Sequence, residues 1–189
     1  MNEKYELTEE FDEIETWKKG WLQKIKVYRI RALRAFADVK IGDLGGFVET
    51  KQNLSNMGNA WVYGNAKVYG NAEVYGNAKV YDNARVCDNA KVYGNAEVCG
   101  DAKVCDNANI FWCSSIGSRH ATTTMFRNKD NGITVTCGCF MGTLEEFAAQ
   151  LEKEHGENIF GKEYKLLIEL AKIHFGLQDE TKGEEENGI

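Results

Sequence analysis

Small and aliphatic residues alternate with polar ones in a strict six-residue period between positions 58 and 111. The segment reads GNAWVY GNAKVY GNAEVY GNAKVY DNARVC DNAKVY GNAEVC GDAKVC DNANIF, which is nine consecutive units without a gap. In each unit an alanine is followed two positions later by valine or, in the last unit, by isoleucine. A period this short and regular predicts a β-solenoid, in which each unit supplies one side of a coil.

The alternation within a unit predicts which side chains face the inside of the coil. Successive side chains of an extended segment point to opposite faces, so the aliphatic residue faces inward and its two neighbours face outward. The Gly-Asn or Asp-Asn pair forms the corner, because glycine and asparagine tolerate the left-handed backbone region that a sharp bend requires. Three sides then close a coil of eighteen residues, and nine units give three coils stacked at about 4.8 Å.

This pattern resembles the left-handed parallel β-helix of hexapeptide-repeat proteins, a family rich in acyltransferases. The segment YRIRALRAFADVKIGDLGGFVE, from Tyr28 to Glu49, is similar to the lead-in of uncharacterised phage and bacterial members, some of which carry an acyltransferase label. The resemblance implies the fold, a phage or prophage source and assembly as a homotrimer with parallel axes. It leaves the function open, because one fold carries many functions.

Segments on both sides of the repeats complete a mainly β protein. Residues 1–56 predict an N-terminal β lead-in, although residues 7–22 also fit a short helix. A first, irregular coil is expected to begin near Phe47, because two extra residues separate Leu54 from Val62. The regular left-handed parallel β-helix then occupies residues 57–112, with three coils of eighteen residues.

The residues after the repeats predict a small α+β cap over 113–178. Residues 121–127 and 133–137 flank a KDNG turn, which indicates a hairpin. Thr143 and Glu146 form a capping box that opens a helix ending near His155, and a second amphipathic helix runs from about residue 162 to Phe175. Residues 179–189 are acidic and polar, which is typical of a disordered tail.

Composition narrows the functional classes. The 189 residues carry a formal net charge of −6, which argues against a general DNA or RNA binder. No apolar run approaches the roughly 20 residues that span a bilayer, and the acidic start MNEKYELTEEFDE differs from a signal peptide. We therefore expect a cytoplasmic protein without a membrane partner, located in the host cytoplasm if a phage encodes it.

The six cysteines fit a reducing compartment. Cys87, Cys99 and Cys105 stand at the outward position that tyrosine occupies in other units, which indicates tolerated surface substitutions. Cys137 and Cys139 form one close pair, without a second pair to complete the four ligands of a zinc site. We expect neither a metal nor a cofactor.

Stacking at eighteen residues sorts the outward side chains onto three faces. Face one carries Trp61, Lys79 and Glu97 beside Tyr63, Tyr81 and Cys99. Face two carries Lys67, Arg85 and Lys103 beside Tyr69, Cys87 and Cys105, and face three carries Glu73, Lys91 and Asn109 beside Tyr75, Tyr93 and Phe111. We predict that Tyr63, Tyr81, Tyr75 and Tyr93 lie in or near the homotrimer interface. The alternative is that tyrosine occurs there because it favours strands.

Face two is uniformly basic, and we call Lys67, Arg85 and Lys103 the basic ladder. Like charges one strand apart repel unless an anion neutralises them, so the ladder is a candidate binding site for phosphate groups in a cleft between subunits. The alternative is that three long basic side chains simply spread into water.

A second candidate site lies where the repeat ends. Hydroxyl groups, a guanidinium and an imidazole gather around a glycine turn and can surround an anion. The alternative is an ordinary polar loop that leads into a threonine-rich strand. The candidate ligand-binding residues are Ser118, Arg119, His120, Thr122 and Thr124.

The sequence holds little that would support catalysis. Hexapeptide acyltransferases usually place a histidine on a coil or an inserted loop as a general base. In this chain the first histidine is His120, which is therefore a weak catalytic candidate, and the coils carry no inserted loop. The leading hypothesis is a non-catalytic phage homotrimer that binds and sequesters an anionic small molecule, such as a nucleotide signal of host immune defence. The alternatives are acyl transfer from acyl-CoA and a scaffold that binds or inhibits a host protein.

Overall fold

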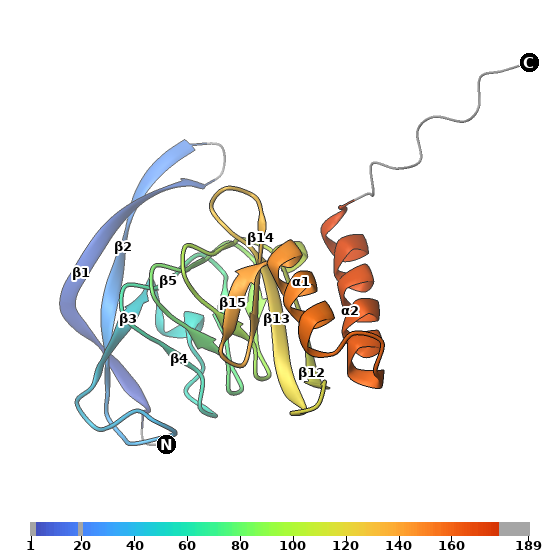
Figure 1. Cartoon of the computed structure of the whole chain (residues 1–189). Helices are drawn as coiled ribbons and strands as arrows, with labels where there is room; N and C mark the ends of the chain where they lie inside the picture. The colour runs from blue at the N-terminus through green and yellow to red at the C-terminus, as the bar shows by residue number, and fades with distance from the viewer. Residues whose placement is uncertain (1–2, 19–20, 178–189) are drawn as a thin grey trace, which may run out of the picture.

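A computed structural model describes residues 3–18 and 21–177 of the chain. A parallel β-solenoid of about three turns forms its centre, with an N-terminal strand pair on one side and a C-terminal sheet with two helices on the other (Figure 1). The mainly β fold expected from the six-residue period is confirmed. Among the described residues, no helix is long and apolar enough to cross a membrane.

The solenoid is built from two-residue strands that pair in parallel at an offset of eighteen residues. β4, β7 and β10 form face one, β5, β8 and β11 belong to face two, and β6 and β9 form face three. The strands are β4 (Trp61–Val62), β5 (Lys67–Val68), β6 (Glu73–Val74), β7 (Lys79–Val80), β8 (Arg85–Val86), β9 (Lys91–Val92), β10 (Glu97–Val98) and β11 (Lys103–Val104).

Each unit of the repeat folds as its side-chain sizes require. The inward valines and the alanines of the first eight units are buried, and a fully buried valine contributes roughly 1.5 kcal/mol or more to stability. The corners adopt positive φ, including Asp82 at 61° and Asp88 at 53°. At one corner the side-chain amides form a ladder, in which Asn59 donates to Asn77 at 3.2 Å and Asn77 donates to Asn95 at 3.0 Å.

The lead-in extends the sheet of face two. β1 (Tyr5–Lys18) and β2 (Trp21–Ala32) pair antiparallel, β2 pairs with β3 (Leu44–Val48), and β3 lies parallel to β5. The strand interpretation of residues 7–22 is confirmed, apart from residues 19–20, which lie outside the described residues. An irregular coil does begin at Phe47, which stands opposite Lys67, and it contains the 3₁₀ turn η1 (Lys51–Asn53) before Leu54 bridges to Val74.

The solenoid has about three turns, as expected, and its last unit departs from the regular rung on face three. Its residues form a 3₁₀ turn, η2 (Asn107–Asn109), and then β12 (Ile110–Ile116). Asp106 accepts a hydrogen bond from the Ala108 amide, and the Asn107 side chain accepts the Lys91 amide that a regular rung would bond through its backbone. Short polar side chains that bond the nearby backbone compete with the strand conformation.

The C-terminal block closes the open end of the solenoid. β12, β13 (Ala121–Arg127), β14 (Ile133–Cys137) and β15 (Phe140–Thr143) form an antiparallel sheet that carries α1 (Leu144–Glu154) and α2 (Ile159–Phe175). The predicted hairpin and the Thr143 capping box are confirmed, whereas α2 begins earlier than expected because Asn158 caps it. The buried Phe126 ring belongs to the same core cluster as the inward valines, so this sheet covers the last coil. Residues 178–189, which include the predicted acidic tail, lie outside the described residues.

Candidate functional site

The N-terminal hairpin covers the end of face two that lies next to the lead-in. Ile14 and Val27 pack with Phe47, Tyr69 and Cys87 in one buried cluster. Face two is therefore an internal boundary between the hairpin and the solenoid over part of its height. The part of face two that remains open lies towards the C-terminal end of the solenoid, beside β8 and β11.

The covered end of the basic ladder is already neutralised. The Lys67 ammonium lies 2.7 Å from the Asp12 carboxylate of β1 and above the Phe47 ring. The hydrogen bond from Lys67 lowers the pKa of Asp12 below its ordinary value, and the charge of Arg85 acts in the same direction. Lys67 thus has an acidic partner within the chain and does not line the open part of face two.

Arg85 and Lys103 form the open end of the ladder. They stand opposite each other in the parallel register of β8 and β11, and both are exposed. Within the described part of the chain, neither side chain has a hydrogen-bond or ion-pair partner. The two strands lie about 4.8 Å apart, so two like charges are neighbours on the sheet, and no described residue forms an ion pair with either of them.

These two cations line a cavity of about 510 Å³, which we call the ladder pocket. Three parts of the chain that are distant in sequence meet there: the end of β1, face two, and the turn between β13 and β14. The lining residues are Glu15, Thr16, Tyr69, Arg85, Cys87, Asp88, Lys103, Cys105, Asn109, Arg127, Asn128, Lys129 and Asn131.

The turn adds two further cations to the ladder pocket, and both are held by the protein. Arg127 donates to the carbonyl oxygens of Asn131 and Phe175 at 2.9 and 2.7 Å. Lys129 is paired with Asp101 at 2.6 Å, which raises the pKa of the ammonium and lowers that of the carboxyl. Of the four cations that line the ladder pocket, Arg85 and Lys103 are the two that lack a hydrogen-bond or ion-pair partner among the described residues.

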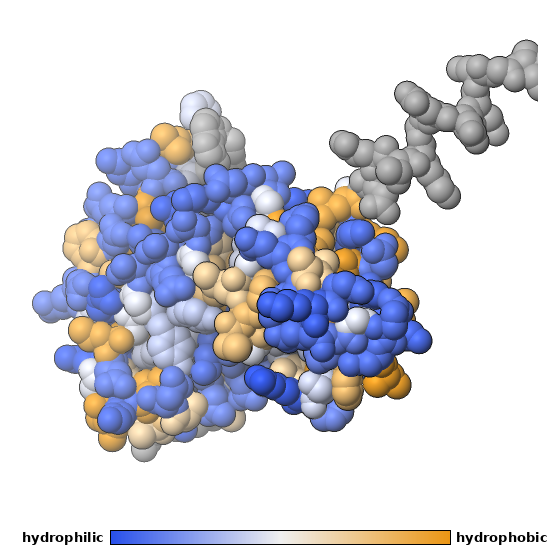
Figure 2. Space-filling view, in the orientation of Figure 1, coloured by the Kyte–Doolittle hydropathy of each residue, from blue (hydrophilic) through white to orange (hydrophobic). Residues whose placement is uncertain are grey.

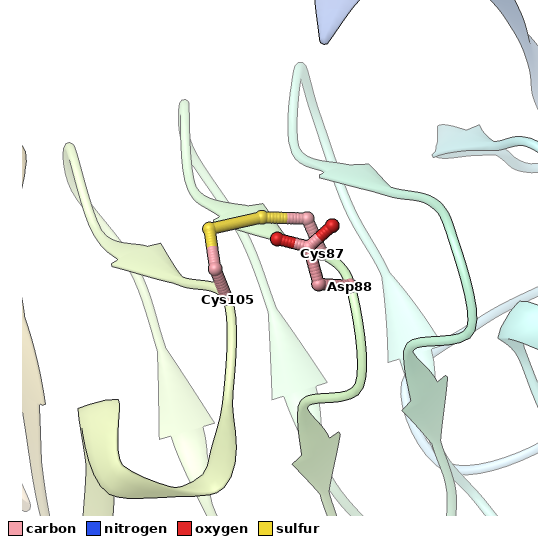
Figure 3. A group of neighbouring side chains, drawn as sticks. All are labelled: Cys87, Asp88 and Cys105. Carbon is pink, nitrogen blue, oxygen red and sulfur yellow. A yellow bond between two sulfur atoms is a disulfide. The ribbon is translucent and has the colours of Figure 1, made fainter. Parts of the chain in front are cut away.

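Two cysteines of face two lie in the ladder pocket, and they are not tolerated surface substitutions. A disulfide joins Cys87 to Cys105, whose Cα atoms are 4.4 Å apart (Figure 3). Cys87 is buried beneath the hairpin cluster, and Cys99 of face one is also buried. The expectation of exposed thiols at these positions is wrong, because the flanking segments cover the solenoid there.

The loop after the last unit does not form one compact donor cluster. Thr124 is buried and accepts the Glu97 amide at 3.1 Å, so it ties the C-terminal sheet to the solenoid. The Thr122 hydroxyl lies 2.9 Å from that of Ser114. Ser118 and Arg119 do line a separate cavity of about 520 Å³ with His155 and Tyr164, whereas His120 is exposed and does not line it.

The four tyrosines proposed for an interface occupy two different settings. Tyr63 donates to Asp38 of the lead-in at 3.0 Å, and Tyr81 lies beside it in a shallow cavity that Met141 also lines. On face three, Tyr75 and Tyr93 stack with ring centroids 4.9 Å apart, and Tyr93 meets Trp112 edge-on. The chain's own flanking segments therefore contact two of the four rings, those of Tyr63 and Tyr93.

Sequence reasoning missed Glu15, Arg127 and Lys129 as neighbours of the basic ladder. Arg127 and Lys129 flank a turn that the sequence does predict. The turn's position depends on a bridge between Ala102 and Asn128, which no local pattern indicates.

No protein-family profile matches the chain, and no curated protein sequence is significantly similar to it.

Proposed function

We propose that the protein is a non-catalytic binder of a small phosphate-bearing anion, which it holds between Arg85 and Lys103. The observation that carries the proposal is this pair of cations, stacked in register and without a partner among the described residues, at the wall of a cavity. Unneutralised like charges on adjacent strands destabilise a sheet. A bound anion removes that cost and gains charge-assisted hydrogen bonds.

The chemistry of the ladder pocket favours a nucleotide among phosphate-bearing ligands. Arg85 can bind one phosphate through two parallel N–H···O bonds, whereas Lys103 acts as a compact point charge. A volume of about 510 Å³ is within the usual range of small-molecule sites. The Glu15 carboxylate and Thr16 hydroxyl at the wall can bond sugar hydroxyls or base amino groups, which inorganic phosphate lacks.

Binding without conversion is the simplest role for this pocket. Among the described residues, its lining contains no histidine, the residue that serves as general base in the acyltransferases that the repeat resembles. A protein that binds a nucleotide and returns it unchanged lowers the free concentration of that nucleotide. In a phage protein within a host cell, the ligand would be a nucleotide signal of immune defence, an extension that rests on the resemblance of the lead-in segment.

Mass spectrometry of small molecules released from the purified protein tests this function. We expect denatured wild-type protein to release a phosphate-bearing compound of unaltered mass, and the Arg85→Ala, Lys103→Ala double variant to release none. Lys91→Ala is the matched control, because Lys91 is paired with Glu73 on face three at 3.4 Å, and it should retain the ligand. Release of a chemically altered product, or equal retention by the double variant, would contradict the proposal.

Self-association is a second candidate role, and an apolar stripe on α2 favours it. The buried side of α2 packs on the sheet, while large side chains at spacings of seven, four, three and four residues lie exposed on the helix and just after it. Apolar residues are visible beside charged ones over α2 in Figure 2. The stripe is Ile159, Leu166, Leu170, Ile173 and Leu177.

The spacing of the stripe is that of a coiled-coil seam, so we propose a second copy of the chain as its partner, as the homotrimer hypothesis requires. Mass photometry of the wild type and of Leu166→Lys tests this. We expect an oligomer that dissociates in the variant, with Lys165→Gln as a control, because Lys165 lies off the stripe and pairs with Glu157 and Glu152. A monomeric wild type would exclude this role without affecting the anion-binding proposal.

A further inference from the structure

Three potential metal ligands meet at the base of the ladder pocket. The sulfur atoms of Cys87 and Cys105 and a carboxylate oxygen of Asp88 all lie within 4.8 Å of one another. Figure 3 shows the two sulfur atoms joined between neighbouring coils, with the Asp88 carboxylate beside them. Cys87 is buried, Cys105 is half-buried and Asp88 is exposed, so the group has one side open to the pocket.

The repeat explains the close approach of the two cysteines. They occupy the same position of successive coils on face two, and their Cα atoms are 4.4 Å apart. Tyr69 occupies this position one coil earlier and is buried, so it closes the side of the group that faces the preceding coil. The cysteines are thus held together by the solenoid backbone, whether or not their sulfur atoms are bonded.

Asp88 differs from its counterpart at the preceding corner. Asp82 also replaces the corner glycine, and its carboxylate accepts a hydrogen bond from the Gly100 amide of the next coil at 3.1 Å. Within the described ranges, the Asp88 carboxylate accepts no hydrogen bond and forms no ion pair. Asp82 therefore has a structural role that Asp88 lacks, although both corners have the same backbone shape.

We propose that the reduced protein binds one Zn²⁺ ion through Cys87, Asp88 and Cys105. Zn²⁺ prefers thiolate, imidazole and carboxylate ligands in a tetrahedral arrangement, and three protein ligands leave one position for water. Ligands at about 2.3 Å from a tetrahedral ion lie roughly 3.8 Å apart, which the group reaches with small side-chain movements. The site extends beyond the anion-binding function and does not depend on it.

The surrounding charges suit this ligand set. Two thiolates and one carboxylate around a divalent ion leave a net charge of about −1. Arg85 opens β8 and Lys103 opens β11, each two residues before the cysteine that follows its strand, and their charges offset it.

Reduction must come before metal binding. A dithiol reductant transfers two electrons and two protons to the Cys87–Cys105 disulfide, which gives two thiols while the reductant closes into its own disulfide. Binding of Zn²⁺ then releases both thiol protons to water as the two metal–sulfur bonds form. The oxidised protein has no thiolate at this position and should not bind the ion.

Metal titration of the full-length protein tests the site. The protein is reduced with a dithiol, freed of reductant under anaerobic conditions and titrated with Co²⁺, which reports thiolate ligation through a charge-transfer absorption band. We expect one equivalent of Co²⁺ to produce the band and one equivalent of Zn²⁺ to remove it, and the oxidised protein to show no band. A reduced wild type without the band would overturn the proposal.

Variants assign the ligands. Cys87→Ser and Cys105→Ser should each abolish the one-equivalent band. Asp88→Asn should weaken Zn²⁺ binding at least tenfold, and it is suited to the corner because asparagine tolerates positive φ. Cys139→Ser removes an exposed cysteine from the turn between β14 and β15, outside the ladder pocket, and should bind as the wild type does. Loss of the band in Cys139→Ser, with retention in Cys87→Ser, would place the metal elsewhere and overturn the proposal.

Discussion

Replacing Arg85 with glutamate reverses one charge in the middle of the basic ladder. Arg85 lies between Lys67 on β5 and Lys103 on β11, each in direct register with it. The substitution converts two repulsive neighbours into attractive ones, and it removes the guanidinium from the ladder pocket. We therefore expect Arg85→Glu to stabilise the protein and to abolish anion binding.

The size of the stabilisation follows from the strand spacing. Unit charges about 6 Å apart in water interact by roughly 0.7 kcal/mol, and salt near 0.1 M reduces this to about 0.4 kcal/mol. Reversing the sign of both contacts contributes roughly 1.5 kcal/mol, and new repulsion from Asp12, which senses the charge at position 85, removes part of it. A net gain of about 1 kcal/mol raises Tm by about 2–4 °C in a chain of this length.

Urea unfolding of ligand-free protein measures this gain. Lys91→Glu is the matched control on face three, because it makes the same charge change opposite Glu73 and should destabilise by about 0.5–1 kcal/mol. Both effects should shrink in 1 M salt, where the Debye length is about 3 Å. A destabilised Arg85→Glu, or one that binds phosphate-bearing ligands as the wild type does, would refute the reasoning.

Three further predictions concern a core tryptophan, a buried lysine and a helix cap. Trp61→Ala should lower the free energy of unfolding by about 3–5 kcal/mol in urea, because Trp61 is 1 % exposed and packs between Tyr5 and Phe36. Trp21 is 75 % exposed, so the control Trp21→Ala should change the free energy of unfolding by less than about 0.5 kcal/mol in the same assay. Burial lowers the pKa of Lys4 to about 8. Between pH 8 and 10 the unfolded chain therefore holds a proton that the folded chain has lost. As the pH rises through this range, the free energy of unfolding of the wild type should increase by about 2–3 kcal/mol relative to that of Lys4→Met. Parallel stability–pH curves for these two proteins would contradict that assignment. Thr143→Ala should cost about 1 kcal/mol in thermal unfolding through loss of the α1 cap, and an unchanged Tm would show that the capping box does not stabilise the cap.

The fold was largely predictable because its information is local and repeated. The valine and alanine positions of each unit indicate which side chains face the inside of the coil, and the offset of eighteen residues alone assigns the outward side chains to three faces. The turn between β13 and β14 and the start of α1 were equally readable, since a turn and a capping box are encoded within a few residues. Asn109, which replaces a long charged residue in the last unit, marks in retrospect where the coil ends.

The candidate site was predictable only in part, because it depends on contacts between distant segments. The repeat places Arg85 and Lys103 side by side. Nothing local indicates that Asp12 neutralises Lys67, or that the hairpin buries Cys87. Thr124 looked like a ligand-binding hydroxyl because sequence does not show that its partner is the Glu97 amide. Such long-range packing decides which charges remain free.

Isothermal titration calorimetry with ATP tests the central claim, that Arg85 and Lys103 form an anion-binding pair. We predict one binding site in the wild type, with affinity at least about tenfold lower in Arg85→Ala and in Lys103→Ala, since each loses hydrogen bonds to a charged group worth about 1.5–3 kcal/mol. Lys91→Ala should bind ATP as the wild type does, because Lys91 is paired on another face. Equal affinity in all four proteins, or no binding of ATP by the wild type, would contradict the account.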